Sequence, residues 1–469
     1  MMIEKKMHRF VLIIFISASL ATEMNYEACK GTSQYDRCST NSACGCFHRI
    51  NTNESSICGF LWTSCSQLEP CRPSDNTCDQ KDSICVHHRR CHNHPVCYPL
   101  SMMNKQICPS ITTTTISTPV REPKWSFTKN RNVTRFENTA SVLSDGKVLV
   151  VGGYGRYGHE CFNTAELYDH TTGNWTLAAS LSIERVFHTA SVLADGKVLV
   201  VGGLNCRKRG CVQSAELYDP RTDTWTSTGS LNYPRCHHVA TVLKNGKVLV
   251  VGGNPEKKLL REPDANISKT CEIYDPITGM WTLTGDMHNG RAFEHQASIL
   301  HDGKVLVTGD STTIDFKQVA ELYDPLTESW TVTGKTNYNR QFHTATVLNN
   351  GKVLVAGGVA YNQSTAELYD PKTGNWTLTG SMNDGRGAHG ASLLTNGKVL
   401  VVGGDDRTSM GLESAELYDP VTESWSRTAP MQLGRTLAQT SMLFDGSVLV
   451  TSDPNVEYLT VGTAEIYSY

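Results

Sequence analysis

Apolar and polar positions follow one pattern that returns about every fifty residues through most of the chain. The run [DN]-G-K-V-L-V begins at Asp145, Asp195, Asn245, Asp302, Asn350 and Asn396, with the variant DGSVLV at Asp445. The run AELYD begins at Ala165, Ala215, Ala320, Ala366 and Ala415, with variants at Cys271 and Ala464. Six of these seven runs continue, six residues after the aspartate, into Trp175, Trp225, Trp281, Trp330, Trp376 and Trp425.

Each part of the repeat predicts a β-strand. Asp-Gly or Asn-Gly between two β-rich runs is a strong hairpin signal. The run KVLVV is apolar at consecutive positions, which is typical of a strand covered on both faces. AELYD alternates, Asp-Pro-x-Thr favours a turn, and Trp-Thr-x-Thr predicts a fourth strand. Four antiparallel strands per repeat, with no amphipathic helix, predict an all-β fold: a seven-bladed β-propeller.

The ends of this region predict how the ring closes. The seventh repeat reaches Tyr469 without a tryptophan strand, while an unassigned tryptophan strand, KWSFT around Trp125, precedes the first repeat. Pairing the first strand with the last blade completes four strands there and removes the open edge.

The repeats resemble the kelch family, and most closely the kelch repeats of galactose-oxidase-like proteins. The shared residues are a double glycine after the second strand, as at Gly152-Gly153, the tyrosine of AELYD and the tryptophan of the fourth strand. The resemblance covers Trp125 to Tyr469. It implies a copper radical oxidase as the catalytic alternative, which in that family needs a tyrosine directly followed by a histidine ligand. No Tyr-His dipeptide occurs in this sequence, so we expect no enzyme activity, no cofactor and no metal.

The N-terminal quarter has a different composition. Basic residues before the apolar run Phe10 to Ala21 predict a signal peptide over residues 1–21. Residues 22–110 predict a disulfide-rich domain, and the Thr/Ser-rich run predicts a linker over 111–123, before the propeller at 124–469. The expected disulfide cysteines here are Cys29, Cys38, Cys44, Cys46, Cys58, Cys65, Cys71, Cys78, Cys85, Cys91, Cys97 and Cys108. A zinc site among the cysteines and histidines from Cys85 to Cys97 is the less favoured alternative.

Charge and modification signals fit a secreted protein. A net charge of −3 argues against non-specific electrostatic binding to nucleic acid or to an anionic membrane. Beyond the N-terminus, no apolar run is long enough to span a bilayer. Six sequons predict N-glycosylation at Asn53, Asn132, Asn174, Asn266, Asn362 and Asn375.

An arginine opens the innermost strand of every repeat, and a histidine follows it in five of them. These arginines are Arg135, Arg185, Arg235, Arg291, Arg340, Arg386 and Arg435. If they ring one mouth of the channel, their guanidinium groups suit bidentate capture of carboxylate or sulfate, as in kelch proteins that bind acidic peptides. Each repeat also carries one glutamate in AELYD, so structural Arg–Glu pairing is the favoured alternative.

The loops after the second strands differ between repeats and are better candidates for specificity. The second repeat places Arg207, Lys208 and Arg209 between Cys206 and Cys211, which could clip this loop with a local disulfide. The sequence leaves the pairing open among Cys161, Cys206, Cys211 and Cys236. The third repeat carries Lys257, Lys258 and Arg261. Cys271 replaces an alanine and is expected to be a buried free thiol. We therefore expect a secreted binding or adhesion protein that recognises an extracellular protein or an acidic glycan through its loop face.

Overall fold

The fold is taken from a computed structural model. It describes residues 44–48, 56–60, 68–75, 77–79, 83–86, 95–99, 122–155, 160–254, 266–309, 319–358, 363–406, 411–452 and 462–469. These residues form two compact units, an N-terminal unit and a propeller. The expected signal peptide, 1–21, and most of the expected linker, 111–123, lie outside the described residues. Within the described part of the chain, no helix combines the length and the apolar character that a membrane span requires.

The N-terminal unit contains two short antiparallel ribbons. Strand β1 (Cys44–His48) pairs with β2 (Ser56–Phe60), and β3 (Ser83–Val86) pairs with β4 (Val96–Pro99). Two disulfides, Cys71–Cys85 and Cys78–Cys97, hold the second ribbon and the segment before it together. Because Cys85 and Cys97 are bonded to other cysteines, they are not available as zinc-binding thiolates. His87 to His94 lie outside the described residues, as do Cys29, Cys38, Cys65, Cys91 and Cys108.

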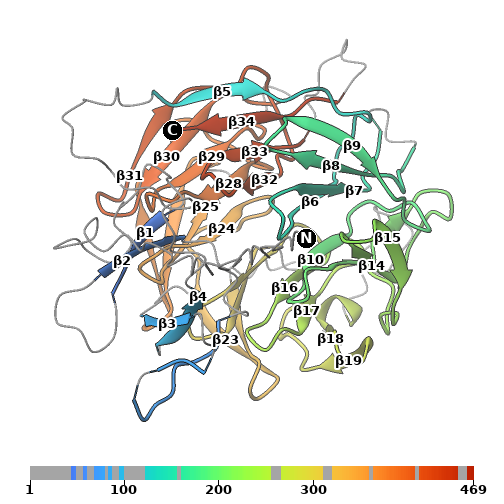
Figure 1. The fold of residues 1–469 in the computed structure, drawn as a ribbon, viewed down its shortest axis with the longest axis horizontal. Coiled ribbons are helices and arrows are strands. Elements are labelled where there is room, and N and C mark those ends of the chain that lie inside the picture. Colours follow the sequence, from blue (N-terminus) through green and yellow to red (C-terminus); the bar gives the residue numbers. More distant parts are fainter. Residues whose placement is uncertain are drawn as a thin grey trace, which may run out of the picture. The chain divides into compact units, whose positions relative to one another are not determined.

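The propeller consists of seven sheets, each with four antiparallel strands, and this confirms the predicted all-β fold (Figure 1). From the inner to the outer strand, blade one contains β6 (Thr139–Val142), β7 (Val148–Val151), β8 (Ala165–Asp169) and β9 (Asn174–Ala178). Blade two contains β10 (Thr189–Val192), β11 (Val198–Val201), β14 (Ala215–Asp219) and β15 (Thr224–Ser227), and blade three β16 (Val239–Val242), β17 (Val248–Val251), β18 (Cys271–Asp275) and β19 (Met280–Thr284). Blade four contains β20 (Gln296–Ile299), β21 (Val305–Thr308), β22 (Val319–Asp324) and β23 (Ser329–Lys335), and blade five β24 (Thr344–Val347), β25 (Val353–Ala356), β26 (Ala366–Asp370) and β27 (Asn375–Thr379). Blade six contains β28 (Gly390–Leu393), β29 (Val399–Val402), β30 (Ala415–Asp419) and β31 (Ser424–Thr428).

Blade seven closes the ring as the sequence predicts. It contains β32 (Thr440–Met442), β33 (Val448–Val450) and β34 (Glu465–Ser468), and its outer strand is β5 (Lys124–Phe127) from the start of the propeller. Trp125 lies opposite Tyr467 in this antiparallel pair. The first strand of the propeller therefore completes the last blade.

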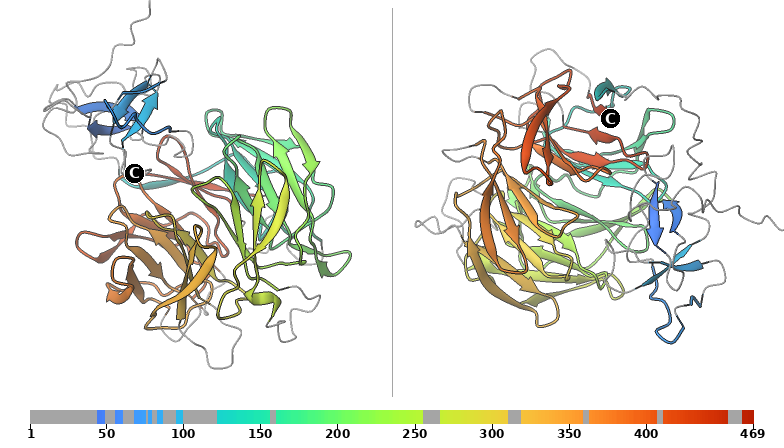
Figure 2. Two further views of the ribbon diagram at one scale, coloured as in Figure 1. Left: turned by 90° about the horizontal axis from the view of Figure 1, so that it is seen from below. Right: turned by 90° about the vertical axis from the view of Figure 1, so that its left-hand side faces the viewer.

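The consecutive apolar residues of each second strand serve two interfaces. In β7, Val148 and Val150 pack in a cluster with Leu449 of blade seven, whereas Leu149 and Val151 pack with residues of blade two. All four β7 residues are buried. This double coverage explains why the KVLVV run does not alternate. Figure 1 shows the inner strands around the centre of the ring, and Figure 2 shows the twisted blades from the side.

Candidate functional site: the loop face and channel mouth of the propeller

Every blade contains a buried arginine–glutamate pair. The arginine precedes the inner strand, and the glutamate comes from the third strand of the same blade. The pairs are Arg135–Glu166, Arg185–Glu216, Arg235–Glu272, Arg291–Glu321, Arg340–Glu367, Arg386–Glu416 and Arg435–Glu465. Their N–O distances run from 2.8 Å, as in Arg185–Glu216, to 3.4 Å in Arg291–Glu321.

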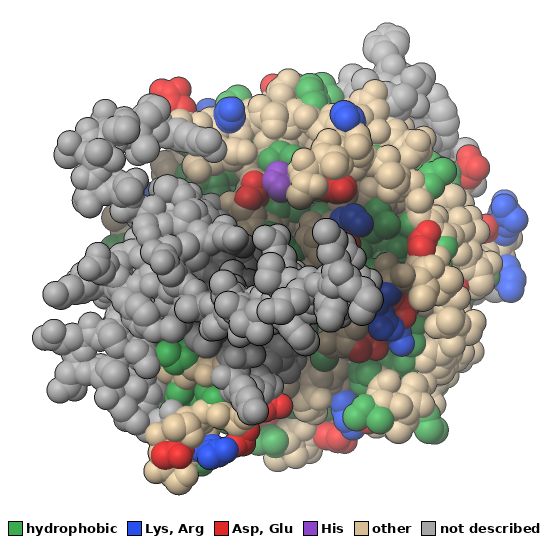
Figure 3. Space-filling view, viewed as in Figure 1, with side chains coloured by type: hydrophobic (Ala, Val, Ile, Leu, Met, Phe, Trp, Pro, Cys, Tyr) green, Lys and Arg blue, Asp and Glu red, His purple; other side chains and the backbone are tan. Residues whose placement is uncertain are grey.

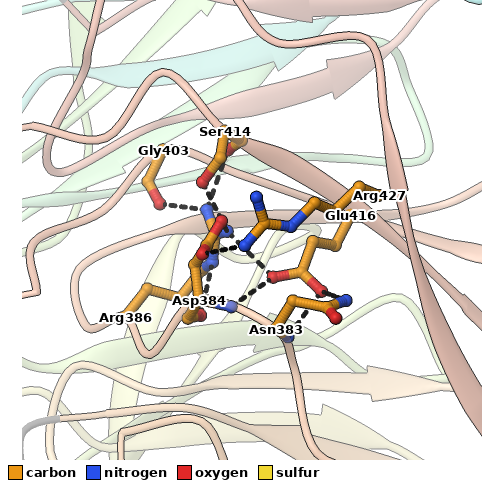
Figure 4. Close-up of polar contacts among 7 residues, drawn as sticks. All are labelled: Asn383, Asp384, Arg386, Gly403, Ser414, Glu416 and Arg427. Atoms are coloured by element: carbon orange, nitrogen blue, oxygen red, sulfur yellow. Dashed lines mark hydrogen bonds and ion pairs between the residues drawn. The ribbon is translucent and has the colours of Figure 1, made fainter.

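Blade six shows how the arginine is held (Figure 4). Arg386 donates from Nη1 to the carbonyl oxygens of Gly403 and Ser414, at 2.7 and 2.8 Å. Its Nη2 donates to the Ser414 hydroxyl and, at 3.2 Å, to Glu416. Glu416 also accepts from the backbone and side-chain amides of Asn383. Burial lowers the pKa of Arg386, while Glu416 acts in the opposite direction.

These contacts correct the expected position of the arginines. Arg135, Arg185, Arg235, Arg291, Arg340, Arg386 and Arg435 are at most 3% exposed, so they do not ring the channel mouth. The physical reason is that their donors are directed to backbone carbonyls at the end of the second strand and to the glutamate beside them. The favoured alternative, structural pairing with the AELYD glutamate, describes all seven.

The five recurrent histidines also have structural partners. Nε2 of His188, His238 and His389 contacts a threonine hydroxyl on the preceding blade, at 2.8 to 3.1 Å. His343 and His295 likewise contact Thr308 and the Val251 carbonyl oxygen, respectively, of their preceding blades. Burial lowers the pKa of His188, His295 and His389 to about 3. They are therefore neutral links between blades.

The residue before each recurrent histidine position forms a second ring, which the sequence analysis missed. These seven residues have left-handed backbone angles, with φ between 51° and 56°, although none is glycine: Glu137, Phe187, His237, Glu294, Phe342, Ala388 and Leu437. A left-handed backbone costs a non-glycine residue about 1 kcal/mol or more. All seven are partly buried. We call this set the mouth ring; each member lies two residues before the first residue of an inner strand, or three in the case of Leu437.

Backbone contacts show that members of the mouth ring are neighbours. The His237 N–H donates to the Phe187 carbonyl at 3.1 Å, and the Ala388 N–H donates to the Phe342 carbonyl at 2.8 Å. Each bond joins one blade to the next. The signal that would have found this ring is the recurrence of one position between the arginine and the histidine, occupied by different residue types.

The basic loop of blade two is a short hairpin, which we call the clamped hairpin. It consists of β12 (Leu204–Asn205), a turn and β13 (Gly210–Cys211). Arg207, Lys208 and Arg209 are exposed in the turn. Arg207 pairs with Glu184 at 3.0 Å, but its side chain remains 87% exposed. The three basic residues therefore project from a fixed support.

The disulfides of this hairpin differ from the expected local clip. Cys206 bonds to Cys161 of blade one, and Cys211 bonds to Cys236 at the start of blade three. In the hairpin register, Cys211 faces Leu204 and not Cys206, so the two cysteines are not opposite each other. Cys271 is a free cysteine and is fully buried, as predicted. Burial raises its thiol pKa to about 12.

The basic residues of the third repeat and the predicted glycosylation sites lie away from the clamped hairpin or outside the described residues. Lys257, Lys258 and Arg261 lie outside the described residues, as do the sequons at Asn53 and Asn362. Asn174, Asn266 and Asn375 are exposed, and Asn132 is exposed but donates from Nδ2 to Glu166 at 3.1 Å. On the face drawn in Figure 3, acidic and basic side chains lie scattered among polar ones.

The described residues contain one cluster of possible metal ligands among their His, Cys, Asp and Glu side chains. Ligand atoms of three or more His, Cys, Asp or Glu residues converge within 4.8 Å only at Cys71, Cys78 and Cys97, which are in disulfides. The recurrent histidines use Nε2 for contacts between blades. A crevice between Arg291 and His343 has room for about one water, roughly 10 Å³.

Comparison with known proteins identifies the repeats. The kelch motif matches residues 135–182, 185–232, 342–383 and 386–432, which include blades one, two, five and six. Four of the seven blades therefore carry the kelch motif. Among curated proteins no match is found.

Solved structures show the same fold at low sequence identity. A fungal alcohol oxidase of the AA5 family, in complex with copper, is 19% identical with a TM-score of 0.59 and covers 74% of this chain and 76% of its own. YjhT is 16% identical with a TM-score of 0.50 and covers 64% of this chain and 99% of its own. At these identities the likeness concerns the fold alone.

Proposed function

We propose that this protein is a secreted, non-enzymatic binding protein whose propeller captures an extracellular acidic protein or glycan through its loop face. The observation that carries the proposal is the clamped hairpin, where three consecutive basic residues are exposed on a rigid support. Secretion is supported by the N-terminal signal pattern and by the disulfides, since disulfides persist mainly in oxidising compartments.

Rigidity matters because binding to a mobile loop costs conformational entropy. Each side of the clamped hairpin is bonded to a different neighbouring blade, and the Asn205 side chain accepts from the Lys208 backbone N–H at 2.7 Å. Glu184 accepts from the Arg207 backbone N–H at 3.1 Å. A turn fixed in advance loses less freedom on binding, so more of the charge attraction contributes to affinity.

The charge of the turn indicates the ligand class. Arginine and lysine in a row attract carboxylates or sulfates, and arginine can bind them with two parallel hydrogen bonds. Lys208 and Arg209 have no side-chain ion pair among the described residues. A copper oxidase is the second candidate and is favoured only by the likeness to the fungal enzyme; the Tyr-His dipeptide that this chemistry uses in the resembling family does not occur in the sequence.

The test uses the full-length protein secreted by cultured cells. Binding to heparin, as a representative sulfated glycan, is measured at several salt concentrations. The variant Lys208→Glu/Arg209→Glu is compared with Arg221→Glu/Lys372→Glu, which makes the same charge change at exposed turns between third and fourth strands. We expect the first variant to bind at least tenfold more weakly and the second to bind within twofold of the wild type.

Two results would overturn the proposal. One is equal loss of binding in both variants, which would indicate a general charge effect rather than a site. The other is copper-dependent release of hydrogen peroxide from alcohols by the purified protein, which would establish an oxidase.

A further inference from the structure

The junction between blades seven and one departs from the repeat at two positions. Blade one has Asn138 where five blades have the recurrent histidine, and blade seven has Ser452 where the other six have a glycine directly after the second strand. At the five junctions with a histidine, this glycine lies against the imidazole of the next blade. A Cβ atom at Gly152 would lie 2.7 Å from Cε1 of His188, closer than real side chains approach. A serine fits in blade seven because an asparagine has replaced the imidazole in the blade that follows.

The contacts around Ser452 show that it has the place of the glycine. Arg435 donates to the Ser452 carbonyl oxygen, as the other recurrent arginines donate to the carbonyl oxygen of the glycine. Thr451, the residue before it, therefore corresponds to Thr308 of blade four. Thr308 contacts Nε2 of the recurrent histidine of blade five at 2.8 Å. Because the blades repeat, the corresponding pair at the junction of blades seven and one is Thr451 and Asn138.

This corresponding pair forms no hydrogen bond. Asn138 and Thr451 are 2% and 0% exposed, yet Nδ2 and Oδ1 of the asparagine and Oγ1 of the threonine have no hydrogen-bond partner among the described residues. An asparagine amide ends one bond nearer to the backbone than the Nε2 of an imidazole. A buried polar atom without a partner has given up its hydrogen bonds to water without a replacement, which weakens the packing around it.

Other polar contacts across this junction do not replace the missing bond. The contact of a tryptophan Nε1 recurs at all seven junctions and does not distinguish them. His170 contacts Asp445 at 2.7 Å across blades seven and one, but their side chains are 30% and 51% exposed, and exposed ion pairs contribute little. The junction of blades six and seven also lacks the histidine, but there Thr440 donates to the Ala391 carbonyl oxygen at 2.9 Å.

We propose that the junction between blades seven and one is a joint that loosens before the other junctions of the ring, with Asn138 and Ser452 as its matched pair of side chains. Local opening begins where buried contacts are weakest. The inner strands β6 and β32, which are neighbours in the ring (Figure 1), would then separate while the junctions with a histidine keep their links. This inference concerns the scaffold and does not rest on the proposed binding function.

The chain offers a matched probe of two junctions. Cys271 is a free, fully buried thiol at the first position of the AELYD run of blade three, where it packs with residues of blade four. Ala464 has the same position in blade seven, is also fully buried and packs with residues of blade one. The variant Ala464→Cys therefore adds a second thiol at the corresponding point of the proposed joint.

The experiment measures how fast iodoacetamide labels each thiol in the folded full-length protein, with the two cysteine peptides followed by mass spectrometry. The loss of one buried hydrogen bond changes an opening equilibrium about tenfold. We therefore expect the thiol introduced by Ala464→Cys to be labelled at least tenfold faster than Cys271. Labelling of both thiols at the same rate, or faster labelling of Cys271, would overturn the inference.

A second set of variants tests the cause. In the Ala464→Cys protein, Asn138→His/Ser452→Gly restores the residue types of the other blades, and labelling of the introduced thiol should slow at least fivefold while that of Cys271 changes less than twofold. Asn138→His alone should lower the urea midpoint, because the imidazole would meet the Cβ of Ser452. An unchanged labelling rate in the restored protein, or a urea midpoint no higher than that of Asn138→His alone, would contradict the proposed role of this pair.

Discussion

The buried pair of blade six gives a sharp prediction about stability. Replacing Glu416 by glutamine keeps the shape of the side chain but removes the charge that faces Arg386. Arg386 is fully buried, and Nη1 and Nη2 also donate to neutral oxygens of Gly403 and Ser414. Its other carboxylate neighbour, Asp384, is partly exposed and lies farther away, at 3.7 Å from Nη2, so it offsets the loss of Glu416 only in part. Leaving one member of a buried pair without its counter-charge costs about 3 to 5 kcal/mol. Glu416 also accepts hydrogen bonds from the backbone and side-chain N–H groups of Asn383. An amide nitrogen at that position would place one donor against another.

The same figure provides a matched control. Arg427 contacts Asp384 at 2.6 Å, a shorter distance than the buried pair, but its side chain is 62% exposed. Exposed ion pairs contribute about 0 to 1 kcal/mol. We therefore expect Glu416→Gln to lower the free energy of unfolding in urea by about 3 to 5 kcal/mol, and Arg427→Ala to lower it by less than about 1 kcal/mol. A Glu416→Gln protein that unfolds at the wild-type urea concentration would refute the reasoning.

Three further predictions concern the contacts between blades. The folded-state pKa of His188, His295 and His389 is about 3, below the ordinary value of about 6.5, so the unfolded chain takes up protons first as the pH falls. The free energy of unfolding should therefore be constant above pH 6.5 and fall between there and pH 3, by about 1.4 kcal/mol per pH unit for each histidine. Urea midpoints that do not change from pH 7.5 to 5 would contradict this. Peptide mapping without reduction should recover Cys161–Cys206 and Cys211–Cys236, whereas a Cys206–Cys211 peptide would show a different clamp. Removing Lys124–Phe127 should expose β34 and make blade seven the first site of limited proteolysis, and an unchanged cleavage pattern would argue against the closure.

The propeller could be predicted from the sequence because each repeat of about fifty residues contains the turn and strand signals of one whole blade. The Asp-Gly hairpins, the continuous apolar second strand and the unassigned Trp125 strand each determine a contact with a neighbour at a fixed spacing. The burial of Cys271 also followed from its place in the repeat, where the other blades have alanine.

The parts of the site that could not be predicted depend on contacts between loops. Which cysteine lies near Cys206 is set by how blades one to three meet and not by distance along the chain. The direction of the Arg386 side chain depends on two carbonyl groups that the sequence does not distinguish from others. The mouth ring escaped notice because left-handed backbone usually signals glycine, while here Glu137 and His237 adopt it.

Closure by β5 and β34 has a consequence for biosynthesis. The strand around Trp125 leaves the ribosome early and has no partner until residues 465–468 have been made. Loss of only those last residues would remove the middle of a sheet, expose the edges of β5 and β33, and leave Arg435 without Glu465. A nascent or truncated chain would therefore display an unpaired sheet edge, the kind of surface that chaperones retain. The pairing of β5 with β34 can therefore form only after the last strand of the propeller has been synthesised.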